Sequence, residues 1–136
     1  MRLPHVQAER MVAHCRAEAP NEACGILAGN GDTVAAVHCL ENAKHSPSEY
    51  DLTAEGYLLV ADLDDAGQLL GCYHSHTHGA AYPSVTDRRL AFWMICYVIV
   101  SLAAEQPVLR AFRLSRDASS PADALADVGE EAVEIV

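Results

Sequence analysis

A hydrophobic run long enough to cross a membrane is absent from the sequence. The apolar run at residues 95–100 has the length of a β-strand, and no run reaches the roughly 18 apolar residues that a transmembrane helix needs. The N-terminal residues include His5, Glu9 and Arg10 and lack the basic-then-apolar order of a signal peptide. We therefore expect no membrane association and, by default, a cytoplasmic location.

The sequence also lacks a Cys-x-x-Cys pair, which argues against a cysteine-based zinc site. The cysteines number 5, an odd count, and most of them lie within apolar, strand-like runs. This placement is typical of buried, reduced thiols rather than of a disulfide framework.

Basic residues are few. The sequence has 9 Lys and Arg residues against 19 Asp and Glu residues, which gives a formal net charge of −10. Because this charge would repel a phosphate backbone, nucleic-acid binding is disfavoured. Solubility is the simplest explanation of the acidic balance.

The chain of 136 residues, 51% of them hydrophobic, is expected to form one globular domain. Apolar periodicity and turn residues predict helices at residues 3–19, 53–65 and 84–91 and strands at residues 22–28, 33–40, 68–73, 95–102 and 108–114. The buried stripe of the first helix should comprise Val6, Met11, Val12 and Cys15. Residues 115–129 are predicted to be a mobile tail or linker, and residues 132–136 are a candidate last edge strand. This order of elements predicts an α/β sandwich with a mixed sheet.

The most informative stretch follows the apolar strand of residues 68–73. Residues two apart in a strand point to the same face, so His74 and His76 can reach one metal ion. A helix then begins near Ser84, and its first turn brings Ser84 and Asp87 to one face. Two imidazoles and one carboxylate make a three-ligand zinc site with a fourth position open for water, which is the catalytic arrangement.

Two alternatives stay open from the residues alone. Ser84 and Asp87 also match a capping box, in which the two side chains simply close the start of a helix. His78 continues the row of alternate histidines and could replace Asp87 as third ligand. Gly79, the next residue, indicates that the strand has already ended, which favours a place for His78 on the rim of a cleft.

His-x-His followed after 7 residues by Ser-x-x-Asp resembles the signature of the JAB/MPN (JAMM) metallopeptidases. That family has a glutamate on an earlier strand, and residues 20–29, Pro-Asn-Glu-Ala-Cys-Gly-Ile-Leu-Ala-Gly, resemble this piece and contain Glu22. The resemblance extends over residues 10–115. It implies a single-domain α-β-α sandwich with a mixed, mostly antiparallel sheet of the cytidine-deaminase-like kind, in residues 1–115, followed by an acidic tail in residues 116–136.

The resemblance assigns a role to each of five residues. His74, His76 and Asp87 would bind one Zn²⁺ per chain. Glu22 would take a proton from the attacking water and return it to the leaving amine, while Ser84 would donate a hydrogen bond to the developing oxyanion. The reaction class is metal-assisted amide hydrolysis.

The commonest form of the family motif has proline where this chain has Thr77. The string in residues 74–87, His-Ser-His-Thr-x-x-x-Ala-Tyr-Pro-Ser-x-Thr-Asp, resembles a small bacterial branch of Mec-type hydrolases. Members of that branch release L-cysteine from the C-terminal glycine of a ubiquitin-like sulfur-carrier protein, in cysteine biosynthesis. Asn42, Ala43, Ser46, Pro47 and Tyr50 resemble a loop of the same group.

The resemblance thus implies a carrier protein with a Gly-Gly C-terminus as partner. A general JAMM peptidase that removes ubiquitin-like modifiers is the main alternative. A non-catalytic MPN scaffold is a second alternative, disfavoured because all five functional residues are present. The sequence leaves open the carrier's identity, the oligomeric state, a homodimer included, and the roles of His78 and of the acidic tail.

Overall fold

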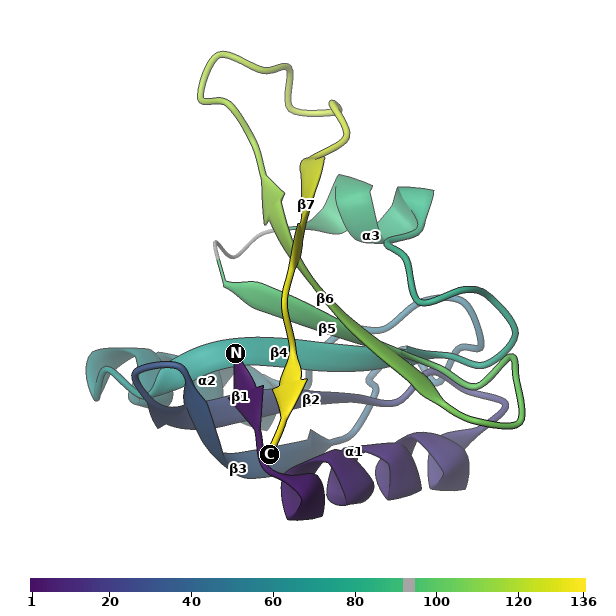
Figure 1. Ribbon diagram of the computed structural model, residues 1–136. Coiled ribbons are helices and arrows are strands. Elements are labelled where there is room, and N and C mark those ends of the chain that lie inside the picture. The colour runs from purple at the N-terminus through teal and green to yellow at the C-terminus, as the bar shows by residue number, and fades with distance from the viewer. Residues whose placement is uncertain (92–94) are drawn as a thin grey trace.

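One mixed sheet organises the chain. The computed structural model describes residues 1–91 and 95–136, and within them the strands are β1 (Arg2–Leu3), β2 (Cys24–Asn30), β3 (Thr33–Leu40), β4 (Leu69–His76), β5 (Cys96–Ser101), β6 (Val108–Ser115), β7 (Asp127–Glu131) and β8 (Glu134–Ile135). These described strands share an 8-stranded sheet in the order β7-β6-β5-β4-β2-β3-β1-β8 (Figure 1). The long pairs β2–β3, β2–β4, β5–β6 and β6–β7 are antiparallel, whereas β4–β5 and the short pairs of β1 are parallel. The predicted mixed, mostly antiparallel sheet is confirmed.

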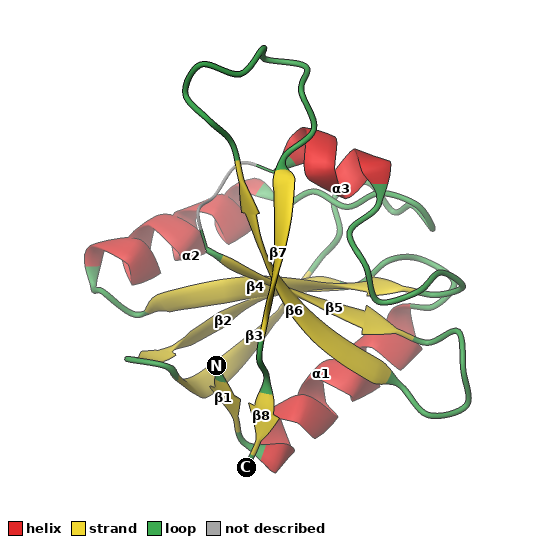
Figure 2. Cartoon of the chain, turned by 45° about the horizontal axis from the view of Figure 1, so that its top comes forward, coloured by secondary structure: helices red, strands yellow, loops and turns green. Residues whose placement is uncertain are grey.

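Helices cover both faces of the sheet (Figure 2). α1 (His5–Glu18) packs on one face, in a core that includes Met11, Cys15 and Val98. α2 (Ala54–Asp65) packs on the other face through Val60, in a second core cluster. α3 (Val85–Leu90) lies at one end of the sheet, and the following Ala91 packs against the same second cluster. The layers therefore follow the expected α-β-α order.

The buried stripe of α1 differs in one residue from the prediction. Met11 and Cys15 are buried and Val12 packs beside them, but Val6 is 66% exposed. Ala8 takes its place against the core. At 100° per residue, Val6 lies about 200° around the helix from Ala8, so it faces solvent.

β4 divides its side chains between the two faces. Cys72 belongs to the core on the α2 side and Tyr73 to the core on the α1 side. Because side chains alternate along a strand, His74 and His76 point to the α2 side, and Ser75 points to the α1 side.

The last segment of the chain closes the sheet. Residues 127–129, predicted as part of a linker, belong to β7, which pairs with β6. Arg110 and Arg113 of β6 form ion pairs with Glu130 and Glu131 at 2.7 and 2.5 Å. Two glutamates of the acidic tail, which directly follow the predicted linker, are therefore paired with arginines on the neighbouring strand. β8 lies beside β1, so a short final strand does form.

All 5 cysteines are free, and Cys39 alone among them is exposed. In the part of the chain that the structure describes, no helix combines the length and the apolar character needed to span a membrane.

Candidate metal centre

Four polar side chains converge where β4 ends. Glu22 precedes β2, His74 and His76 close β4, and Asp87 lies in the first turn of α3. One potential ligand atom of each lies within 4.8 Å of those of the other three. Glu22 is 4% and His74 is 1% exposed, so the group is largely shielded from solvent.

Three of these atoms are spaced like the ligands of one ion. The Nε2 atoms of His74 and His76 are 3.2 Å apart, and they lie 3.2 and 3.1 Å from Oδ2 of Asp87. Ligands about 2.0 Å from a tetrahedral zinc ion would be about 3.3 Å from one another. Two imidazole nitrogens and a carboxylate oxygen are also ligands that zinc accepts readily. The residues present therefore fit a zinc ion.

Hydrogen bonds to the backbone orient two of the candidate ligands. Nδ1 of His76 lies 2.8 Å from the carbonyl oxygen of Ala80, to which it donates. With this nitrogen protonated, Nε2 is the ring atom that would bind a metal ion. The Ser84 N–H donates to Oδ2 of Asp87 at 2.8 Å, and the Asp87 N–H donates to Oγ of Ser84 at 3.0 Å. The capping box weighed as an alternative is therefore present, and it holds the Asp87 carboxylate toward the histidines.

His74 is supported differently. Its ring stacks on the ring of Tyr50, with centroids 4.5 Å apart and an interplanar angle of 23°. Its Nδ1 atom is buried and has no hydrogen-bond partner among residues 1–91 and 95–136. The His74 ring is therefore supported by stacking on Tyr50, whereas the His76 ring is held by a hydrogen bond to a backbone carbonyl.

The two carboxyl groups are shifted in opposite directions. Burial raises the pKa of Glu22 to about 7, and the charge of Asp87 adds to this rise while positive charge on the histidines opposes it. Burial also disfavours the ionised form of Asp87, but the charge of His74 and hydrogen bonds from both histidines and the Ser84 amide hold its pKa well below its usual value. For His76, burial opposes the charged ring, but its hydrogen bonds to Asp87 and Ala80 raise its pKa overall. The lowered pKa suits Asp87 to be a permanently anionic ligand, and the raised pKa suits Glu22 to exchange a proton beside it.

Ser75, between the two histidines, connects β4 to the segment of Glu22. Its Oγ accepts a 2.8 Å hydrogen bond from the N–H of Ala23, and its own N–H donates to the Ala23 carbonyl at 3.0 Å. Side-chain alternation along the strand indicates only that Ser75 lies on the face opposite His74 and His76. No sequence signal indicates these contacts, because each of them involves a backbone atom of Ala23.

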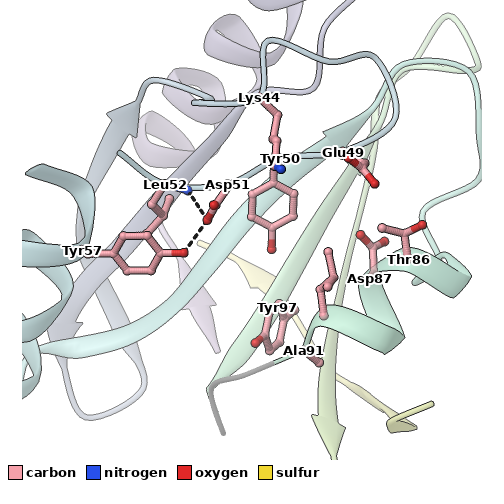
Figure 3. A pocket seen from close by; sticks show the side chains of 11 residues that line it. Lys44, Glu49, Tyr50, Asp51, Leu52, Tyr57, Thr86, Asp87, Ala91 and Tyr97 are labelled. Carbon is pink, nitrogen blue, oxygen red and sulfur yellow. Dashed lines mark hydrogen bonds between the residues drawn. The ribbon is translucent and has the colours of Figure 1, made fainter. Parts of the chain in front are cut away.

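A cavity of about 380 Å³ adjoins the cluster at Asp87 (Figure 3). Its walls come from the loop before α2, from α2 and from α3, and include Lys44, Glu49, Tyr50, Asp51, Tyr57, Thr86 and Leu90. Figure 3 shows the ring of Tyr50 pointing from the loop into this cavity. The same ring stacks on His74. The cavity and the metal-ligand cluster therefore share a wall.

The structure brings together the predicted Glu22, His74, His76 and Asp87, with Ser84 at the cap beside them. His78 is exposed and follows the end of β4. It does not belong to the group of potential ligands found among the described residues.

Known proteins resemble this chain in sequence. A sequence profile described as prokaryotic homologs of the JAB domain matches residues 4–115. The CysO-cysteine peptidase of Mycobacterium bovis is 45% identical over 85 residues, which cover 60% of this chain and 58% of the peptidase. The desampylase of Haloferax volcanii is 36% identical over 94 residues, which cover 62% of this chain and 68% of the desampylase. The match thus spans less than two thirds of the mycobacterial relative.

A solved structure extends the likeness to the whole chain. The crystal structure of AF2198, a JAB1/MPN domain protein from Archaeoglobus fulgidus, has a TM-score of 0.60 at 16% identity and covers 100% of this chain and 99% of that one. At this identity the likeness concerns the fold alone. It confirms the predicted JAB/MPN architecture.

Proposed function

The chain belongs to the family of prokaryotic JAB-domain proteins, and from this premise we propose that it is a zinc-dependent hydrolase. Its substrate would be a ubiquitin-like sulfur-carrier protein, cut at the amide bond after the C-terminal glycine, with release of L-cysteine. The observation that carries the proposal is the triangle of ligand atoms from His74, His76 and Asp87, with edges of 3.1–3.2 Å, beside the buried Glu22.

His74, His76 and Asp87 would hold the ion. A zinc ion in such a site lowers the pKa of water and polarises a carbonyl group. All other steps that we assign are performed by side chains of this protein.

Glu22 is proposed to move the proton. Its carboxylate would take a proton from the attacking water and deliver it to the departing amine as the amide bond breaks. In the metal-free protein, burial raises the pKa of Glu22 to about 7, toward the neutral range in which a group can both accept and return a proton. Low exposure also keeps bulk water from competing for that proton.

Ser84 is proposed to stabilise the oxyanion. Its hydroxyl oxygen accepts the Asp87 N–H, and a hydroxyl that accepts one hydrogen bond still has its own proton to donate. The capping box fixes this hydroxyl beside Asp87, so the donor would be in place before substrate binds.

The proposed substrate class rests on the mycobacterial relative, which is named for CysO-cysteine. A Gly-Gly tail would suit a buried site, because glycine lets the substrate backbone approach closely. The cavity beside Asp87 is a suitable place for the groups that flank the scissile bond. A second candidate function is the removal of ubiquitin-like modifiers from proteins, which the similarity to a desampylase favours.

Mass spectrometry of a synthetic carrier–cysteine adduct tests the proposal. Zinc-loaded wild type should remove the mass of one cysteine, and the Glu22→Gln variant should leave the adduct intact. An adduct that survives wild type while one equivalent of zinc is bound would reject the carrier-specific function. A modifier–lysine isopeptide supplied in parallel would then test the second candidate. If wild type binds no zinc, both hydrolase assignments are wrong.

A further inference from the structure

The loop between β3 and α2 is organised around one buried side chain, Asn42, which is 6% exposed. Its amide nitrogen donates to the carbonyl oxygens of Glu22 and Glu49, each at 2.9 Å. Its amide oxygen accepts the N–H groups of Lys44 at 3.0 Å and Asp51 at 3.2 Å. A side-chain amide offers two donor hydrogens and two acceptor lone pairs, so Asn42 makes its full set of hydrogen bonds.

These four contacts join two parts of the candidate metal centre. One donor holds the backbone of Glu22, whose own N–H is fixed from the same loop by the carbonyl of Ser46 at 2.9 Å. The other donor and one acceptor hold Glu49 and Asp51, the two neighbours of Tyr50. Asn42 therefore fixes both the segment that presents Glu22 and the segment that presents the ring stacked on His74.

The backbone beside Tyr50 is anchored by further hydrogen bonds. The adjacent Asp51 carboxylate accepts hydrogen bonds from the Tyr57 hydroxyl and from the N–H of Leu52, drawn as dashed lines in Figure 3. The residues on both sides of Tyr50 are therefore held in place where its ring stacks on His74.

The loop also contains an unfavourable backbone conformation. His45 has a φ of 47°, in the left-handed region that side-chain-bearing residues seldom adopt. Its N–H donates to the backbone carbonyl of Asn42 at 3.1 Å. Such conformations persist where the surrounding contacts determine the backbone strongly, and they concentrate at functional sites.

We infer that Asn42 is a positioning residue of the metal centre, which uses one side-chain amide to fix the backbone of Glu22 and, through its loop, the Tyr50 ring that supports His74. The inference rests on the proposed metal-binding role of His74. Second-sphere contacts usually act through a hydrogen bond to the outer nitrogen of a ligating histidine. Nδ1 of His74 has no such bond among the described residues, so ring stacking is left to orient the imidazole.

The test uses a substitution of unchanged size. Asn42→Asp replaces both N–H donors by an acceptor, which meets the carbonyls of Glu22 and Glu49, while the N–H groups of Lys44 and Asp51 keep their partner. Asn30→Asp makes the same chemical change at the exposed end of β2 and serves as the matched control. Tyr50→Leu removes the stacked ring, and Tyr50→Phe keeps it.

Zinc affinity, measured by competition with a chromophoric chelator, is the first readout. Asn42→Asp and Tyr50→Leu should each weaken zinc binding on the order of 10–100-fold, as lost supporting residues do, whereas Asn30→Asp and Tyr50→Phe should stay within about threefold of wild type. The double variant Asn42→Asp/Tyr50→Leu should bind zinc no more weakly than whichever single variant has the lower zinc affinity. The reason is that both substitutions would weaken zinc binding through the loss of the same Tyr50 ring from His74. The inference is wrong if folded Asn42→Asp binds zinc like wild type, or if the two losses multiply.

The second readout is the NMR signal of the His74 ring protons in the metal-free protein. Stacking on Tyr50 should shift them upfield in wild type, and Asn42→Asp should remove this shift as fully as Tyr50→Leu does. An unchanged shift in Asn42→Asp would overturn the inference. A merely destabilising substitution would leave the signals of the folded fraction unchanged.

Two arrangements keep the test decisive. If Asn42→Asp does not fold, hydrogen exchange of the wild-type Lys44 and Asp51 amides replaces it: slow exchange supports the role of Asn42, and exchange at the rate of free peptide rejects it. Absence of zinc binding by wild type would reject the proposed function itself. Equal binding by wild type and Asn42→Asp would reject only the positioning role.

Discussion

Glutamine in place of Glu22 should make the metal-free protein more stable and the enzyme inactive. Glu22 is 4% exposed, and its Oε1 atom has no hydrogen-bond partner within residues 1–91 and 95–136. Burial raises its pKa from 4.5 to about 7. A shift of this size means that the ionised carboxylate costs the folded, metal-free protein about 3 kcal/mol.

The pH dependence of this cost has a definite sign. Between pH 4.5 and about pH 7, the two pKa values, the folded protein binds the Glu22 proton more tightly than the unfolded chain does, so the free energy of unfolding falls as the pH rises. Above this window the whole cost is present, and below it none remains. Because glutamine does not titrate, the free energy of unfolding of Glu22→Gln relative to wild type should increase by roughly 2–3 kcal/mol between pH 5 and pH 8.

Urea denaturation in the presence of a chelator, at pH 5 and pH 8, measures this difference. The buried glutamine amide has its own cost, but that cost is independent of pH, so the change between the two pH values is diagnostic. Glu9→Gln, at an exposed position of α1, is the matched control and should show a much smaller change. A difference between Glu22→Gln and wild type that stays constant from pH 5 to pH 8, or turnover that survives the substitution, would refute the reasoning.

Three further substitutions separate the roles of neighbouring residues. Asp87→Asn removes the anionic ligand, so calorimetry should show a loss of zinc affinity greater than the roughly 10–100-fold caused by losing a supporting residue; affinity unchanged would contradict the ligand assignment. Ser84→Ala should lower kcat on the order of 100-fold or more and the free energy of unfolding by about 1 kcal/mol through the lost cap; a loss of stability with normal turnover would leave Ser84 only its capping role. In Gly25→Ala, a Cβ atom would lie 2.2 Å from the Tyr73 ring, so thermal denaturation should show that the free energy of unfolding falls by about 3 kcal/mol or more. In the control Gly79→Ala, the added Cβ atom would have no neighbour nearer than 3.8 Å, and this variant should unfold like wild type.

The sequence predicts those parts of the site that depend on local periodicity. The alternation of β4 places His74 and His76 on one face, and the spacing of Ser84 and Asp87 gives the helix start that the structure contains. Glu22 is different, because an acid at the start of a strand has no local feature that distinguishes a buried carboxyl from an exposed one. Its place beside the histidines comes from the pairing of β2 with β4, in which Cys24 lies opposite His74. Only the resemblance to a family could indicate it.

Contacts between side chains and distant backbone atoms were not predictable. Asn42 lies in a loop of mostly polar residues, and nothing in the sequence distinguishes a buried polar side chain there from an exposed one. Its four partners are backbone groups, which carry no sequence signal. β7 was missed for a related reason. The Asp, Ala and Ser content of residues 115–129 suggested a linker, and the pairing of residues 127–131 with β6 has no local signal in the sequence. Ion pairs of Glu130 and Glu131 with Arg110 and Arg113 add to this pairing.

β4 shows how the face opposite the site contributes to it. The strand pairs with β2 on one side and β5 on the other, so its backbone has little freedom. On the α1 face, Ser75 holds Ala23, and the Tyr73 hydroxyl lies 2.6 Å from Nδ1 of His14 in α1. Both contacts restrict the same few residues of β4 whose neighbours carry the candidate ligands on the other face. The positions of the histidines and of Glu22 therefore depend on contacts of the α1 face as well as on the contacts among the four side chains themselves.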